Sequence, residues 1–212
     1  MKLLFFGDSI TDAERYRGDT PFTNALLGYG YVMQIAGRLY ERSPVKYEIV
    51  NKGIGGHRIV DLYSRIKCDV WNEKPDVLTI FVGINDIWHE IDFTNGVDLE
   101  RFERMYRMLL SDTKKVLPDT RIIIIEPFIV HGTATNHVYK ELSEVYEYAK
   151  VAKKLAEEFG CSYLPIQQKF TEATEKYGEG VFTIDGVHPT VQGATLIANE
   201  WVKLFEKIEG EV

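Results

Sequence analysis

Residues 2–11 read Lys-Leu-Leu-Phe-Phe-Gly-Asp-Ser-Ile-Thr, an apolar run that stops at Gly7-Asp8-Ser9. A short and continuously apolar run is typical of a β-strand covered on both faces. We therefore predict a first strand over residues 2–6, with Ser9 just beyond its carboxyl end. Comparable runs follow along the chain. They predict four more strands, over residues 47–51, 77–82, 121–126 and 162–166.

Longer segments with helical periodicity lie between the predicted strands. Apolar residues recur at steps of three and four over residues 138–159, 102–116 and 191–208, and more weakly over 31–41 and 59–71. Alternation of strands and helices indicates βαβ units, and hence a parallel sheet with helices on both faces. We expect one α/β domain over residues 1–212, a three-layer α/β/α sandwich whose five-stranded parallel sheet has the order 2-1-3-4-5.

Composition is ordinary for a globular domain and disfavours some partners. The 212 residues are 45% hydrophobic and 27% charged, with a net charge of −7. A chain of this length buries about 70% of the surface that its unfolded form exposes. An acidic surface repels phosphate backbones, so we expect no nucleic-acid partner.

The cysteines and the apolar runs bear on the compartment. Cys68 and Cys161 lie far apart and form no CxxC pair; two buried thiols in a reducing compartment are favoured over one long-range disulfide. The first apolar run is too short for a signal-peptide core. No stretch approaches the ~20 apolar residues of a membrane span. We expect a cytoplasmic protein with no membrane partner.

Polar and glycine-rich motifs follow the first three predicted strands, and a fourth precedes the last helix. In parallel sheets, ligand sites form outside the carboxyl ends of the strands, where the strand order reverses. Strands two, one and three would be neighbours there, so three loops distant in sequence would meet. The long irregular segment 12–30 is a candidate for the substrate-facing rim. The four motifs are Gly7-Asp8-Ser9, Asn51-Lys52-Gly53-Ile54-Gly55-Gly56, Gly83-Ile84-Asn85-Asp86 and Asp185-Gly186-Val187-His188.

These motifs hold the parts that acyl transfer needs. The Ser9 hydroxyl becomes a useful nucleophile when a base accepts its proton, and the His188 imidazole suits that role. Asp185, three residues earlier, can accept from the other ring nitrogen and orient the imidazole. The backbone N–H groups of Ser9 and Gly56 and the amide of Asn85 are candidate oxyanion donors.

Several other residues lie in or near the motifs. Trp88 is a candidate substrate-binding wall or, equally, a plug in the core. We expect Asp8 and Asp86 to hold loop backbone. The remaining histidines share no metal-ligand spacing, so no metal is expected. His57 and His89 are candidate pocket residues.

Each motif alone has an ordinary structural explanation. Ser9 could be an N-cap, and His188 with the following proline could be a loop-to-helix junction. The segment 53–56 could suggest a phosphate loop, but no Lys-Ser/Thr pair follows it. Four motifs in one order, three at the ends of predicted strands and the fourth before the last helix, favour catalysis over these separate explanations.

The chain resembles the SGNH hydrolases, also called GDSL esterases and lipases. Their four defining residues would be Ser9, Gly56, Asn85 and His188, and the resemblance runs from the first strand to the last helix. It implies a flavodoxin-like sandwich, a Ser-His-Asp triad, and neither a metal nor an organic cofactor. Within the family, the chain is most similar to microbial carbohydrate acetyl esterases, including intracellular acetylxylan esterases. It departs from some of them at Ile184, where they have tryptophan.

These observations predict a serine esterase that removes short acyl groups, chiefly acetyl, from carbohydrates through an acyl-serine intermediate. The expected partner is a small-molecule or oligosaccharide ester, and a homo-oligomer is left open. A general carboxylesterase, thioesterase or lysophospholipase is the alternative within hydrolysis. A non-catalytic carbohydrate-binding module on the same fold is the alternative outside it.

Overall fold

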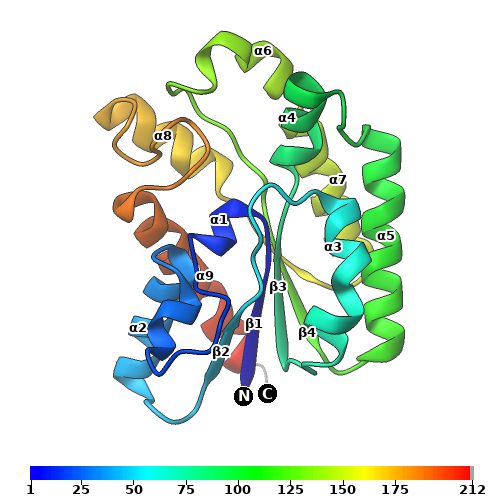
Figure 1. Cartoon of the computed structure of the whole chain (residues 1–212), viewed down its shortest axis with the longest axis vertical. Helices are drawn as coiled ribbons and strands as arrows, with labels where there is room; N and C mark the ends of the chain where they lie inside the picture. Colours follow the sequence, from blue (N-terminus) through cyan, green and yellow to red (C-terminus); the bar gives the residue numbers. More distant parts are fainter. Residues whose placement is uncertain (211–212) are drawn as a thin grey trace.

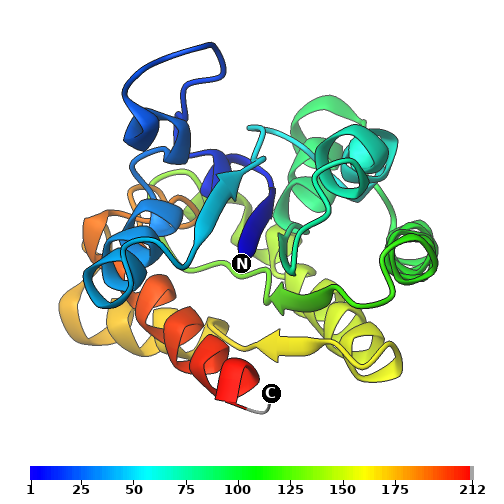
Figure 2. The ribbon, with the colours of Figure 1, turned by 90° about the horizontal axis from the view of Figure 1, so that it is seen from below.

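The computed structural model describes residues 1–210, which form a parallel five-stranded sheet between two layers of helices (Figures 1 and 2). The strand order is β2-β1-β3-β4-β5, as predicted. Every strand pair is parallel, with Leu3 of β1 opposite Ile49 of β2 and Val77 of β3. The strands are β1 Lys2–Gly7, β2 Glu48–Asn51, β3 Val77–Phe81, β4 Arg121–Ile125 and β5 Ser162–Leu164.

The apolar runs form strands because helices cover both of their faces. Leu3, Leu4, Phe5 and Phe6 are all fully buried, and every residue of β3 is buried. On one face α2 packs against α9, and on the other α3, α5 and α7 lie in a row (Figure 2). The helices of these two layers are α2 Tyr31–Arg42, α3 Ile59–Ile66, α5 Leu99–Val116, α7 Val145–Glu158 and α9 Val191–Gly210.

The last helix is fixed to the middle of the sheet. Trp201 of α9 is fully buried, stacks on Phe205, and donates its indole N–H to Thr79 Oγ1 of β3 at 3.0 Å. Thr79 is a polar residue in a fully buried strand, and this hydrogen bond satisfies it. Docking of α9 brings the loop that precedes it to the carboxyl edge of the sheet.

Several helices differ from the sequence-based expectation. The predicted helix over 138–159 is broken into three pieces: η3 Asn136–Val138, α6 Tyr139–Leu142 and α7. Ser143 lies at the break, where its hydroxyl donates to the Lys140 carbonyl and competes with helical hydrogen bonding. The predicted helix over 59–71 consists of α3 followed by a π-helical turn, η2 Lys67–Trp71.

Two helices were not predicted, and the segment 12–30 is not wholly irregular. The unpredicted helices are α4 Ile84–Phe93 and α8 Gln167–Tyr177. The third motif runs into α4, and α8 has only two buried apolar residues, Phe170 and Ala173, too few to reveal a helical period. The short helix α1 Ser9–Asp12 and the 3₁₀ turn η1 Thr23–Leu27 occupy the two ends of the rim segment.

Both cysteines are free thiols, in line with the favoured expectation, but they are not both buried. Cys161 is half-buried, whereas Cys68, in the π-helical turn, is exposed. Within residues 1–210, no helix combines the length and apolar character required to cross a bilayer.

Candidate active site

Segments far apart in the sequence meet at the carboxyl edge of the sheet, above β1 and β3 (Figure 1). Ser9 begins α1 directly after β1. Asp8 caps this short helix by accepting the Ile10 N–H at 3.0 Å. A Cβ at Gly7 would lie 2.4 Å from both the Phe81 carbonyl and Thr11 Oγ1, so only glycine allows this close approach. The turn therefore holds the Ser9 hydroxyl at a fixed place.

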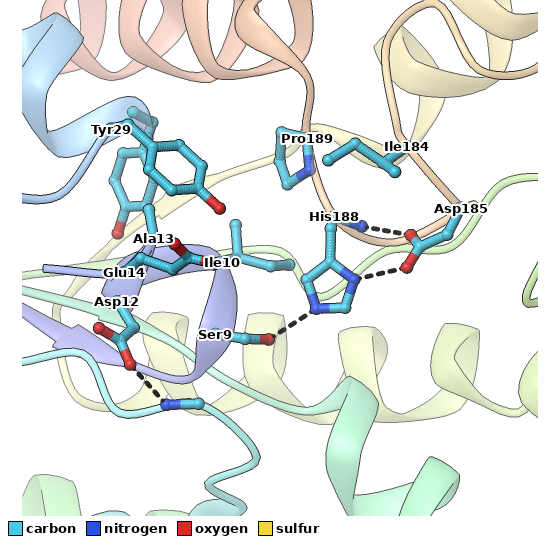
Figure 3. Close-up of a pocket in the computed structure, with 13 residues that line it drawn as sticks. Ser9, Ile10, Asp12, Ala13, Glu14, Tyr29, Ile184, Asp185, His188 and Pro189 are labelled. Atoms are coloured by element: carbon cyan, nitrogen blue, oxygen red, sulfur yellow. Dashed lines mark hydrogen bonds and ion pairs between the residues drawn. The ribbon is translucent and has the colours of Figure 1, made fainter.

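Ser9, His188 and Asp185 form one continuous hydrogen-bonded chain (Figure 3). Ser9 Oγ lies 2.9 Å from His188 Nε2, and His188 Nδ1 lies 2.7 Å from Asp185 Oδ2. With the proton on Nδ1, the imidazole donates to Asp185, and its other nitrogen accepts from the serine hydroxyl. The sequence predicted these three residues together, and the structure brings them into contact.

The electrostatics of the pair favour a charged aspartate and a more basic histidine. Burial alone would raise the pKa of Asp185, but hydrogen bonds from the His188 ring and from two backbone N–H groups hold it at about 2. The hydrogen bond to Asp185 raises the pKa of His188, against the opposing effect of its own burial. The aspartate is therefore ionised and ready to stabilise an imidazolium.

The loop that carries the pair is braced locally. Asp185 Oδ1 accepts the N–H groups of Val187 and His188 at 3.0 and 2.8 Å, so the carboxylate both orients the ring and closes its own turn. Gly186, with a φ of +108°, passes close to the segment after β4 and accepts the Val130 N–H through its carbonyl at 2.9 Å. Neighbouring chain thus supports the turn from behind.

The predicted oxyanion donors Ser9, Gly56 and Asn85 come from three segments, and the Gly56 loop contacts the start of α4. Gly56 has a φ of +78°, in the left-handed region that favours glycine. Asn85, in the first turn of α4, donates one amide hydrogen to the His57 carbonyl at 3.1 Å. An amide nitrogen has two hydrogens, so the second remains for a substrate oxygen. The roles of Ser9, Gly56 and Asn85 as oxyanion donors stay predictions.

Two buried aspartates hold backbone, as expected. Asp86 accepts the Ile59 N–H at 3.1 Å and so anchors the start of α3 behind the Gly56 loop. Burial raises the pKa of Asp86 well above its ordinary value. Burial likewise raises the pKa of Asp8 to about 7, although the hydrogen bond from Ile10 opposes this. Both side chains accept hydrogen bonds from backbone N–H groups.

Asp12 is a third carboxylate that shapes the site. Its Oδ2 accepts the Gly55 N–H at 2.9 Å and also binds the Arg17 guanidinium. A Cβ on Gly53 would lie 2.2 Å from the Asp12 N atom, so the two loops pack backbone to backbone. The loop after β2 is thereby fixed directly against the helix that begins at Ser9.

Arg65 is a site residue that the sequence did not indicate. From α3 it donates to the Gly7 and Lys52 carbonyls at 3.1 and 2.7 Å and to His57 Nδ1 at 3.0 Å. It also pairs with Asp69 and is only 10% exposed. One guanidinium thus ties together the chain leaving β1 and the chain leaving β2. In the sequence of an amphipathic helix, nothing indicates that a particular arginine points inward and binds backbone carbonyls.

A pocket of about 370 Å³ opens beside the Ser9 hydroxyl (Figure 3). This volume is in the range of ~300–1,000 Å³ that is typical of small-molecule sites. Trp88 is not among the lining residues; its ring lies next to His188, with centroids 6.4 Å apart, and packs against the core. The lining residues are Ser9, Ile10, Asp12, Ala13, Glu14, Tyr29, Gly30, Tyr31, Gly55, Ile184, Asp185, His188 and Pro189.

Two of the other histidines, His57 and His131, interact with neighbouring side chains. His57 accepts from Arg65, and burial together with that cation lowers its pKa. The His131 ring stacks on Tyr139. In the described part of the chain, residues 1–210, no three His, Cys, Asp or Glu side chains are grouped to hold a metal ion.

Comparison with known proteins agrees with this geometry. Residues 5–196 match the GDSL-like Lipase/Acylhydrolase family. The chain belongs to this family. It is therefore a carboxylic ester hydrolase of the GDSL type.

Among the relatives of this GDSL enzyme is an acetylxylan esterase from Geobacillus stearothermophilus, 33% identical over 95% of this chain and 92% of that protein. Its crystal structure superposes with a TM-score of 0.84, at 35% identity over 96% of this chain and 93% of that one. A GDSL-like protein from Parabacteroides merdae gives a TM-score of 0.90, at 36% identity, over 96% and 94% of the two chains.

Mutant structures of the Geobacillus esterase show which residue types matter in that protein. Three are catalytic mutants in which a serine, an aspartate or a histidine is replaced by alanine, the last two lying three positions apart. In another, isoleucine replaces the tryptophan immediately before that aspartate.

Proposed function

We propose that this GDSL enzyme removes short acyl groups, chiefly acetyl, from carbohydrates through an acyl-serine intermediate. The observation that carries the proposal is the unbroken hydrogen-bonded chain Ser9–His188–Asp185 beside a pocket. The same three residue types, with the same spacing between aspartate and histidine, are catalytic in the acetylxylan esterase. Similarity over nearly the whole chain supports a carbohydrate ester as the substrate class.

In the first half of the reaction, Ser9 Oγ attacks the ester carbonyl carbon and its proton passes to His188 Nε2. The contact of 2.9 Å lies within the reach that proton transfer requires. Asp185 stabilises the imidazolium that forms, and it stays ionised. The negative charge on the former carbonyl oxygen is met by the N–H groups of Ser9 and Gly56 and by the free amide hydrogen of Asn85.

Collapse of this intermediate breaks the bond between the acyl carbon and the alcohol oxygen. His188 returns the proton to that oxygen, the sugar leaves as a free alcohol, and Ser9 remains acylated. Water then enters the vacated position and gives its proton to His188 as it attacks the acyl carbon. Release of acetate restores the Ser9 hydroxyl and the neutral imidazole.

Acetate release from a panel of acetylated xylo-oligosaccharides tests the proposal, with the Ser9→Ala protein as the blank. The hydroxyl is small and lies in an open pocket, so the variant should fold normally and lose turnover. We expect burst kinetics with an activated ester, and labelling of Ser9 by a fluorophosphonate. Substantial activity in purified Ser9→Ala protein would overturn the mechanism.

Nitrophenyl esters of increasing chain length separate acetyl removal from a general carboxylesterase or lysophospholipase activity. We expect a steep fall in kcat/KM beyond the shortest chains. A maximum at longer chains would replace the acetyl proposal with the lipase-like alternative.

A further inference from the structure

The pocket wall next to Ser9 has an unusual backbone. Ala13 and Glu14 are consecutive residues with φ angles of +42° and +56°. A residue with a Cβ rarely adopts this left-handed conformation, and two in succession are less common still. Such strain persists where surrounding contacts impose it, and it concentrates at ligand sites.

The contacts that impose it come from residues 28–30. A Cβ on Gly28 would lie 2.4 Å from the Asp12 carbonyl oxygen, and one on Gly30 would lie 2.7 Å from Ala13 Cβ. Tyr29 donates its N–H to the Ala13 carbonyl at 3.0 Å. The two ends of the rim segment are therefore clamped together, and Glu14 and Tyr29 are brought to the same wall of the pocket (Figure 3).

The two side chains have unused recognition capacity. Among the other carboxylates of the pocket, Asp185 is held by His188 and Asp12 Oδ2 by Gly55 and Arg17, whereas Asp12 Oδ1 is buried with no hydrogen-bond partner among residues 1–210. Glu14 is exposed and makes no ion pair with any basic side chain of residues 1–210. Tyr29 is 61% exposed. Partial burial and the neighbouring Glu14 carboxylate raise the pKa of Tyr29.

We propose that Glu14 and Tyr29 form the subsite that holds the leaving sugar of the ester. Glu14 accepts a hydrogen bond from a hydroxyl next to the acylated oxygen, and the Tyr29 ring contacts the C–H face of the sugar. The subsite rests on the proposed carbohydrate deacetylation and identifies the residues that select the alcohol.

The test measures kcat/KM of each variant with two substrates. One is an acetylated xylotriose, and the other is 4-nitrophenyl acetate, whose leaving group has no neighbouring hydroxyl. Glu14→Gln keeps the shape and removes the charge, whereas Glu14→Gly removes the side chain and suits the left-handed backbone. We expect the ratio of kcat/KM for the sugar ester to that for the aryl ester to fall about 10- to 100-fold in Glu14→Gly, mostly through KM, as loss of a hydrogen bond to a charged group implies. The ratio should fall less in Glu14→Gln.

Tyr29→Ala should lower the same ratio, and Tyr29→Phe should lower it less than Tyr29→Ala because the ring remains. Glu41→Gln is the matched control, because Glu41 is an exposed glutamate near the end of α2 and does not line the pocket. Equal ratios in wild type, Glu14→Gly and Tyr29→Ala, with the sugar ester still cleaved, would overturn the subsite and spare the proposed function. Absence of acetate release from every sugar by the wild type would overturn both.

Discussion

The two sides of the candidate active site are built in opposite ways. The base side is mostly local: Asp185 binds the ring of His188 and the backbone of its own turn within four residues, and the segment after β4 adds backbone hydrogen bonds to that turn. The oxyanion side is assembled from three segments, and Arg65, Asp86 and Asp12 hold those segments together. A local module can tolerate changes elsewhere in the protein. An assembled one depends on every buried polar contact that ties its parts.

The largest expected effect tests the independence of the base side. Asp185→Asn retains an oxygen that can accept the N–H groups of Val187 and His188, so the turn should persist. The amide cannot hold the imidazole in the required tautomer, and we expect kcat to fall about 10⁴-fold. Steady-state kinetics together with thermal unfolding check this. A large drop in melting temperature would mean that the charge, rather than the hydrogen-bond geometry, maintains the turn.

The next effect concerns the donors on the oxyanion side. Asn85→Ala should lower kcat by about 10²–10³-fold with KM little changed, since an oxyanion contact strengthens only in the transition state. Asn85→Asp is the sharper companion variant, because a carboxylate of similar size cannot donate and repels the developing charge. If Asn85→Asp kept wild-type kcat, Asn85 would serve only to hold the His57 carbonyl.

Arg65 tests whether the assembled side depends on buried ties. Arg65→Gln removes a nearly buried cation that contacts Gly7, Lys52 and Asp69, and we expect about 3 kcal/mol of destabilisation. We also expect a loss in kcat smaller than that of Asn85→Ala. Arg107→Gln provides the control: Arg107 pairs with Glu103 and Glu158 at the surface, where such pairs contribute about 1 kcal/mol or less. Equal unfolding free energies for the two variants would refute the tie.

The pH profile is the mildest test and links the two sides. Only the neutral His188 can accept the serine proton, so kcat/KM should fall about tenfold per unit as pH drops below the His188 pKa, which Asp185 and the charge of Asp8 both raise. Asp8→Asn keeps an acceptor for the Ile10 N–H and removes a carboxyl whose pKa is about 7. The acid limb should then move to lower pH. A shift to higher pH would contradict the assigned interaction.

What the sequence could predict follows the same division. Continuous apolar runs located the strands, and the Asp-x-x-His spacing placed the base beside its orienting residue, because both signals are local. Arg65 gave no signal, since its partners are backbone carbonyls from distant segments. The strained pair Ala13–Glu14 was also hidden, because glycines 28 and 30 impose it from across the rim. The helix break at Ser143 was not predicted for a different reason. The apolar period continues through this position, but the Ser143 hydroxyl competes with helical hydrogen bonding.

The hydrogen bond between Ser9 and His188 joins positions 179 residues apart, and this separation has a consequence for biosynthesis. On the ribosome the hydroxyl is translated early, whereas the imidazole emerges only after all five strands. Until α9 docks through Trp201, the nascent polypeptide carries an alcohol with no partner to activate it. Hydrolytic competence thus arrives in a single late event, and a cut in the loop before α9 would be expected to abolish it if the pieces separated.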